Sequence, residues 1–192
     1  MEYTDTVLQD KNSVVEYSWL WKQNQIYLTQ AEATLATKYA SSAEQGILEL
    51  GRGGSTVLLT HSSNVPVISV DSQARVSSEV ADALKKAGTG QSTRMINEAT
   101  YKINMSGNTV DVMLVGQNIN PTADGADKAL VGLINHYWPN ITNGGHALFY
   151  NYKINEKTHI NTVVNLLVNS GRGKVVDQAG KLVAVEKLRD LE

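Results

Sequence analysis

The stretch from Ile47 to Ser72, ILELGRGGSTVLLTHSSNVPVISVDS, decides the fold of this chain. It begins with a short apolar run that carries an acid, Glu49, and continues into a turn with three glycines between positions 51 and 54. Two hydroxyl residues that can cap a helix follow, and then an apolar helical stretch. A second apolar run over 65–70 stops on Asp71. The pattern predicts a strand, a glycine turn, a helix and a second strand.

Each part of this unit suits a bound nucleoside. Glycines let the backbone approach a ligand closely, and the N-terminus of the helix offers N–H groups that have no partner within the helix. A carboxylate about 20 residues further along can accept hydrogen bonds from both ribose hydroxyls, and Asp71 occupies that place. The alternative is an ordinary strand–turn–helix–strand packing unit with a glycine corner and no ligand.

Composition and charge exclude several classes of protein. The chain has 192 residues, of which 42% are hydrophobic and 19% charged, as expected for one globular domain with a sizeable core. A net charge of −2 and a pI of about 6.1 predict no general attraction to nucleic acid or membranes. Without cysteine, the chain has no disulfide, thiolate metal site or cysteine nucleophile. No signal-peptide pattern or membrane-length apolar run is visible, so we expect a cytoplasmic protein.

Strands that alternate with helices predict one Rossmann-like α/β domain over residues 26–192, after an N-terminal helical extension or lid over 1–25. Continuous apolar runs suit the buried middle of a parallel sheet. Right-handed crossovers then give a doubly wound, mostly parallel sheet with helices on both faces, and a C-terminal hairpin adds an antiparallel edge. The expected strands cover 47–49, 65–70, 93–96, 110–115, 146–150, 174–177 and 181–186, with a turn at 143–145. The expected helices cover 26–39, 77–87, 123–137 and 157–169.

This layout resembles the class I S-adenosylmethionine-dependent methyltransferases over nearly the whole chain. The residues that carry the resemblance are the run Glu49 to Thr56, the acid Asp71, and Asn97-Glu98-Ala99 after the third strand. The fourth strand (110–114) and the fifth (144–149) add support. Small O-methyltransferase-like members are the most similar. The glycine motif alone is a weak signal, but five elements in the right order at strand ends make a stronger one.

The resemblance implies that residues at strand ends bind S-adenosylmethionine: Glu49, Gly51, Arg52, Gly53, Gly54, Ser55, Asp71, Ser72, Asn97, Glu98, Ala99 and Gly116. Glu49 and the glycine run would hold the amino and carboxylate ends of the cofactor. Asp71 would take the ribose hydroxyls, with Ser72 beside the adenosine. Either Asn97 or Glu98 would accept a hydrogen bond from the adenine amino group, and Ala99 would supply a backbone N–H.

On the acceptor side the chain departs from the family. Similar O-methyltransferases carry an Asp at the end of the fourth strand and another before a Tyr after the fifth, where this chain has Gly116 and Asn151. Carboxylates that could hold Mg²⁺ or act as a general base are therefore absent from both places. We expect metal-independent methyl transfer to a small molecule, at oxygen rather than nitrogen, with Asn118, Asn151 and Tyr152 orienting the acceptor.

Several alternatives remain open from the sequence. Another residue, such as His61 or His159, could act as the base. The chain could also bind S-adenosylmethionine or a partner without transferring a methyl group. A nicotinamide dinucleotide fits less well, because the third glycine of its G-x-G-x-x-G fingerprint falls on Thr56. We expect no nucleic-acid or membrane partner, and a homodimer is one option for the oligomeric state.

Overall fold

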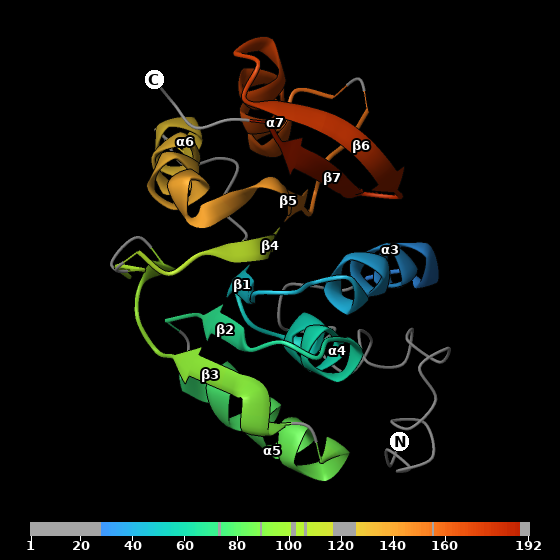
Figure 1. The fold of residues 1–192 in the computed structure, drawn as a ribbon, viewed down its shortest axis with the longest axis vertical. Helices are drawn as coiled ribbons and strands as arrows, with labels where there is room; N and C mark the ends of the chain where they lie inside the picture. Colours follow the sequence, from blue (N-terminus) through green and yellow to red (C-terminus); the bar gives the residue numbers. More distant parts are fainter. Residues whose placement is uncertain are drawn as a thin grey trace.

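The computed structural model of the chain describes residues 28–72, 74–88, 90–100, 103–105, 107–116, 126–154 and 156–188. Within these ranges the chain forms a seven-stranded sheet in the order β3-β2-β1-β4-β5-β7-β6 (Figure 1). The first five strands of this order run parallel, and β7 is antiparallel to both of its neighbours. The predicted doubly wound α/β sheet with an antiparallel terminal hairpin is confirmed.

The bounds of the elements agree with the sequence pattern to within a few residues in most places. The strands are β1 (Ile47–Leu50), β2 (Val67–Val70), β3 (Thr93–Ile96), β4 (Val110–Val115), β5 (Ile141–Phe149), β6 (Gly173–Ala179) and β7 (Leu182–Lys187). The helices are α3 (Gln30–Ser41), α4 (Gly54–Ser62), α5 (Ala74–Ala87), α6 (Ala126–Tyr137) and α7 (His159–Asn169), with short 3-10 turns η1 (Gly90–Ser92) and η3 (Trp138–Asn140). None of the helices in the described ranges is long and apolar enough to cross a membrane.

Each strand of the sheet centre sends successive side chains to opposite faces, as the pleat requires. Val112 and Leu114 of β4 pack in the core that α3, α4 and α5 cover, whereas Met113 and Val115 pack in the core under α6 and α7. Figure 1 shows α3 and α4 on one side of the sheet and α6 on the other. Because both faces are covered, the middle strands read as continuous apolar runs.

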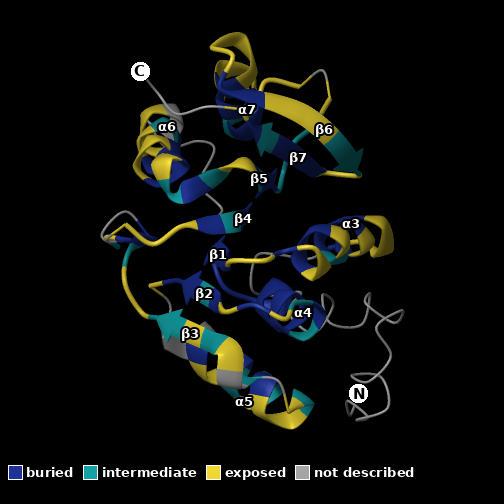
Figure 2. Cartoon of the chain, in the orientation of Figure 1, coloured by how far each residue is buried: buried dark blue, intermediate teal, exposed yellow. Residues whose placement is uncertain are grey.

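Helix α4 is the most enclosed of the described helices. All of its residues except His61 are buried, and Figure 2 shows it in the buried colour while α5 and α6 each expose a face. The apolar stretch after the glycine turn, which carries no charge before His61, is explained by this position. The glycine turn at its N-terminus is therefore held between the sheet and neighbouring helices.

The structure corrects the predicted turn at 143–145, which lies inside β5. Pairing of β4 with β5 passes from Val110 opposite Ile141 to Val112 opposite His146, so β5 bulges there. Gly145 is required because an added Cβ would lie 2.9 Å from the carbonyl oxygens of Asp111 and Thr142. The glycines thus serve a bulge rather than a turn. The predicted extension over 1–25 and the predicted helix start near 123 lie outside the described residues, and the domain division stays a prediction.

Candidate functional site

The carboxyl ends of β1, β2, β3 and β4 meet at one edge of the sheet. The strand order runs from β1 to β2 and β3 in one direction and to β4 and β5 in the other, so it reverses between β1 and β4. Ligands of open α/β sheets bind in the crevice at such a point. The cofactor-binding residues expected from the sequence lie near the ends of these four strands or in the segments that follow them, with Gly54 and Ser55 already in α4. Their contact with a cofactor remains a prediction.

The glycine turn joins β1 to α4. Gly51 has a φ of 94°, which a residue with a side chain rarely adopts, and its N–H donates to the Val70 carbonyl at 2.9 Å. Gly53 is the N-cap of α4, so Ser55 and Thr56 lie in the first turn of the helix rather than capping it as the sequence predicted. The Thr56 hydroxyl nevertheless accepts the N–H of Gly53 at 3.1 Å.

Glu49 is fully buried and occupied by hydroxyl donors. Its Oε1 accepts from Ser55, and its Oε2 accepts from Thr56 and Ser69, both at 2.6 Å. Ser55 and Thr56 belong to α4, and Ser69 belongs to β2. The carboxylate therefore ties the first turn of α4 to the middle of the sheet. In this arrangement Glu49 holds the first turn of α4 against β2. Its contact with the cofactor, which the family resemblance implies, stays a prediction.

We expect Glu49 to make the stability of the protein depend on pH. Burial raises its pKa from 4.5 to about 7, although the hydroxyl donors and Arg52 act in the opposite direction. The folded state therefore binds the proton of the Glu49 carboxyl more tightly than the unfolded state does. The stabilisation that this difference contributes is complete below pH 4.5 and is lost as the pH rises through about 7. The free energy of unfolding should fall by about 2–3 kcal/mol between roughly pH 5 and pH 8, as measured by urea denaturation.

Two variants isolate this contribution. Glu49→Gln cannot titrate and should show a flatter pH dependence than the wild type. Glu44→Gln changes an exposed acid next to the same strand and serves as the matched control. If Glu49→Gln kept the full wild-type slope, the pH dependence would have to come from another group.

Arg52 lies between two glycines, yet it is only 2% exposed. All five N–H groups of its guanidinium have partners. Nε donates to the Ser69 hydroxyl at 3.2 Å, and Nη2 donates to the carbonyls of Ser69 and Ile96 at 2.6 and 3.0 Å. Nη1 donates to the Ser77 hydroxyl and to Asn97 Oδ1. One side chain thus joins the ends of β2 and β3 to α5.

Electrostatics explain why a buried guanidinium is tolerated here. Burial lowers the pKa of Arg52, while the carboxylates of Glu49 and Asp71 raise it. The Ser69 hydroxyl accepts from Arg52 and donates to Glu49, so it links the two charges. No local sequence pattern indicates this network, because an arginine in a glycine turn is ordinarily expected at the surface.

Asp71 follows β2 and is only 8% exposed. Its Oδ2 accepts the backbone N–H of Arg52 at 2.8 Å, and its own N–H donates to the Ile96 carbonyl at 3.1 Å. The carboxylate is thereby fixed beside the glycine turn. Asp71 follows the second strand as the sequence predicted, and its contact with a ribose stays a prediction. Ser72, Asn97 and Glu98 lie close by in the chain and are exposed, whereas Ala99 is half-buried and Gly116 is buried at the end of β4.

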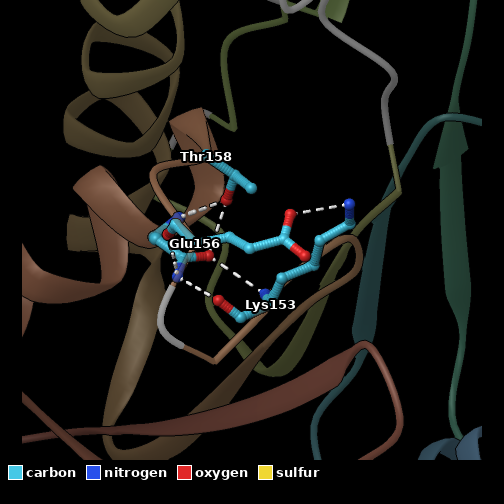
Figure 3. Close-up of polar contacts among 4 residues, drawn as sticks. Lys153, Glu156 and Thr158 are labelled. Carbon is cyan, nitrogen blue, oxygen red and sulfur yellow. Dashed lines mark hydrogen bonds and ion pairs between the residues drawn. The ribbon is translucent and has the colours of Figure 1, made fainter.

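The loop between β5 and α7 borders the same edge on the acceptor side. Figure 3 shows Lys153, Glu156 and Thr158 in this loop, with Lys153 Nζ 2.8 Å from Glu156 Oε2. The buried Asn161 of α7 donates to the carbonyls of Lys153 and Glu156 at 2.5 and 2.9 Å. Its Oδ1 accepts from the Thr158 hydroxyl at 2.6 Å. Asn161, which sequence analysis missed, therefore organises this loop.

The residues expected to orient the acceptor are only partly within the described ranges. Asn151 lies in the turn after β5 and has a left-handed φ of 68°, which asparagine tolerates better than most residues. The N–H of Tyr152 donates to the Lys181 carbonyl at 2.9 Å, which places it beside the β6–β7 hairpin. Asn118 lies outside the described residues. Asn151 and Tyr152 are both half-buried.

The two histidines considered as alternative bases lie at different ends of their helices. His61 is in the last turn of α4, about one helix length from the glycine turn, so it lies far from the candidate site. His159 begins α7, directly after the loop on the acceptor side. Among the described residues, no group of three or more His, Asp or Glu side chains could hold a metal ion.

Comparison with known proteins identifies the fold. No family model matches the sequence, and no curated protein is detectably similar to it. Among solved structures, the SAH-bound methyltransferase PaMTH1 of Podospora anserina matches with a TM-score of 0.69 at 13% identity, over 92% of this chain and 88% of that chain. A provisionally named caffeoyl-CoA O-methyltransferase of Staphylococcus aureus matches with a TM-score of 0.69 at 13% identity, over 98% and 93%.

The fold is that of S-adenosylmethionine-dependent methyltransferases. A provisionally named rRNA methylase of Clostridium thermocellum also matches, with a TM-score of 0.60 at 15% identity over 82% of this chain and 96% of that chain. The expectation that nucleic acid is excluded therefore has no support from the fold. At these identities the likeness decides neither the acceptor nor the accepting atom.

Proposed function

We propose that the chain binds S-adenosylmethionine at the carboxyl edge of β1, β2, β3 and β4 and transfers its methyl group to an acceptor. The observation that carries this proposal is the buried Asp71 beside the glycine turn, at the point where the strand order reverses. Its Oδ2 is oriented by the Arg52 N–H. A ribose with two vicinal hydroxyls suits such a fixed carboxylate.

The chemistry of the edge also suits a cationic nucleoside. When bound, S-adenosylmethionine supplies a methyl group on a sulfonium ion that a nucleophile can attack. Two carboxylates, Asp71 and the exposed Glu98, lie at this edge, and the backbone N–H groups at the start of α4 can meet the carboxylate end of the cofactor. A positive ligand is favoured where carboxylates balance its charge.

A small molecule is the proposed acceptor, with attack by oxygen rather than nitrogen. The described acceptor side offers Asn151 and Tyr152, which can hold a substrate by hydrogen bonds, and His159, which can accept a proton. Asn151 and Tyr152 would act by orientation, which can lower the barrier by several kcal/mol without a strong base. The acceptor then needs to be nucleophilic by its own chemistry.

A second candidate function is binding of the cofactor or a partner without methyl transfer. It is favoured by one observation: Gly116 and Asn151 follow the ends of β4 and β5, where similar O-methyltransferases place carboxylates. A dinucleotide is less well supported, because the place of its third glycine is held by Thr56, whose hydroxyl donates to Glu49.

Calorimetry tests the cofactor proposal first. S-adenosylmethionine and S-adenosylhomocysteine should each bind at one site per chain, while NAD should not bind at matched concentration. An acceptor screen that follows S-adenosylhomocysteine release, with small-molecule hydroxyl and amine compounds and with RNA, then separates the two candidate functions. Failure of both adenosyl compounds to bind would contradict the proposal.

Methyl transfer is expected to be independent of divalent metal. The reason is the absence of carboxylates at Gly116 and Asn151, since a hard cation normally needs one or two of them. Initial rates should be equal with excess EDTA and with added Mg²⁺ or Mn²⁺. Loss of activity on chelation and rescue by metal would contradict this prediction and would point to Asp124 or Asp127, early in the segment after β4.

A further inference from the structure

The side-chain amide of Asn97 is held through its oxygen atom. Asn97 is the first residue after β3, and its Oδ1 accepts from Arg52 Nη1 and from the Ser77 hydroxyl, each at 2.7 Å. Both donors are buried, whereas Asn97 itself is exposed. The oxygen of the amide therefore faces into the protein at this edge.

The identity of the inward atom follows from chemistry. A guanidinium nitrogen can only donate, so the Asn97 atom that faces Arg52 must be the carbonyl oxygen. The amide nitrogen is on the other branch of the planar carboxamide, so it does not share the contacts that hold the oxygen, and Asn97 is exposed to solvent. A change in the orientation of the Arg52 guanidinium would break hydrogen bonds, because each of its five N–H groups has a partner.

Arg52 also reaches the position expected for the ribose. Its backbone N–H holds Asp71 Oδ2 at 2.8 Å, while its side chain holds Asn97 Oδ1 at 2.7 Å. One residue thus orients a carboxylate after β2 and an amide after β3. At these two positions, side chains would contact the ribose and the base of a nucleoside bound at this edge.

We propose that Arg52 is a positioning residue that makes Asn97 a hydrogen-bond donor to a ring nitrogen of the bound nucleobase. This inference rests on the proposed function. It replaces the expectation that Asn97 accepts from the adenine amino group, a contact that then falls to Glu98. The nucleoside is therefore recognised through an acceptor nitrogen of its ring as well as through its amino group.

The experiment compares S-adenosylhomocysteine with its 1-deaza, 3-deaza and 7-deaza analogues by calorimetry. Each analogue replaces one acceptor nitrogen of adenine by CH. One of the three should bind the wild type about tenfold weaker than S-adenosylhomocysteine, since one neutral hydrogen bond is lost. The other two should bind within about threefold.

Asn97→Asp keeps an oxygen that Arg52 and Ser77 can contact, and it replaces the N–H donor by an acceptor oxygen with a negative charge. The Asn97→Asp variant should bind S-adenosylhomocysteine about tenfold weaker than the wild type does. The deaza analogue that binds the wild type weakly should then lose less than about twofold in affinity relative to S-adenosylhomocysteine in this variant. Asn143→Asp is the matched control, because Asn143 is exposed in β5 at the bulge, away from the carboxyl edge. Arg52→Lys, with a fold checked by its thermal melt, should reduce the same deaza penalty because lysine cannot reproduce the fork.

The outcomes separate the two proposals. If the wild type binds S-adenosylhomocysteine but all three analogues bind equally well, the donor role of Asn97 is wrong while the proposed function stands. The same conclusion follows if Asn97→Asp keeps the full deaza penalty. If the wild type binds no adenosyl compound, the proposed function fails and the inference fails with it.

Discussion

Replacing Asp71 by alanine is expected to weaken S-adenosylhomocysteine binding by about 2–3 kcal/mol, or roughly 30- to 150-fold in Kd. The carboxylate is 8% exposed and is held by the Arg52 N–H at 2.8 Å, so it is preorganised to accept from two ribose hydroxyls. Alanine removes a charged acceptor and leaves the two ribose hydroxyls without a partner at a position that solvent scarcely reaches. Isothermal titration calorimetry measures the loss directly.

Two further variants show whether the loss comes from the ribose. Asp71→Asn keeps an acceptor for the Arg52 N–H but removes the charge, and should cost less than alanine does. Asp82→Ala removes an exposed acid of α5 and should leave Kd unchanged. Equal affinity in Asp71→Ala and the wild type would mean that the ribose lies elsewhere.

Arg52→Met is expected to have the largest effect on stability. Methionine fills similar space but leaves the carbonyls of Ser69 and Ile96 without the donors they now have. It also removes the positive charge nearest to Glu49 and Asp71 in this network. Removing one member of a buried charged network commonly costs about 3–5 kcal/mol, which is a large share of the stability of an ordinary domain.

Urea denaturation at pH 7 measures this loss, with Arg94→Met as control. Arg94 is exposed on the neighbouring strand β3, so its replacement should change the free energy of unfolding by less than about 0.5 kcal/mol. A loss below about 1 kcal/mol in Arg52→Met would mean that water replaces the guanidinium and that the network does not hold the edge together.

The outline of the fold, and the edge of the sheet at which the site lies, could be predicted from local patterns. The predicted bounds of β3 and β4 match the observed ones. The run that predicted β4 is apolar except for Asp111, because a strand covered on both faces shows little polar alternation. Gly51 and Asp71 were placed correctly at strand ends because backbone freedom and charge at a boundary are properties of single positions. The predicted turn at 143–145 was wrong, since an Asn-Gly-Gly run specifies a turn and a strand bulge equally well.

What the tertiary structure alone decided is how the polar side chains of the site pair. The buried Glu49 accepts a hydrogen bond from Ser69 of β2. The buried Arg52 donates to Ser69, to Ser77 of α5 and to Asn97 after β3, and the packing of these elements brings the partners together. Those partners lie 17 to 45 positions from Arg52 in the chain. The sequence by itself therefore determined where a nucleoside site can form, because strand ends follow from local periodicity. Which atoms face the ligand depends on contacts between distant segments, and no local pattern encodes them.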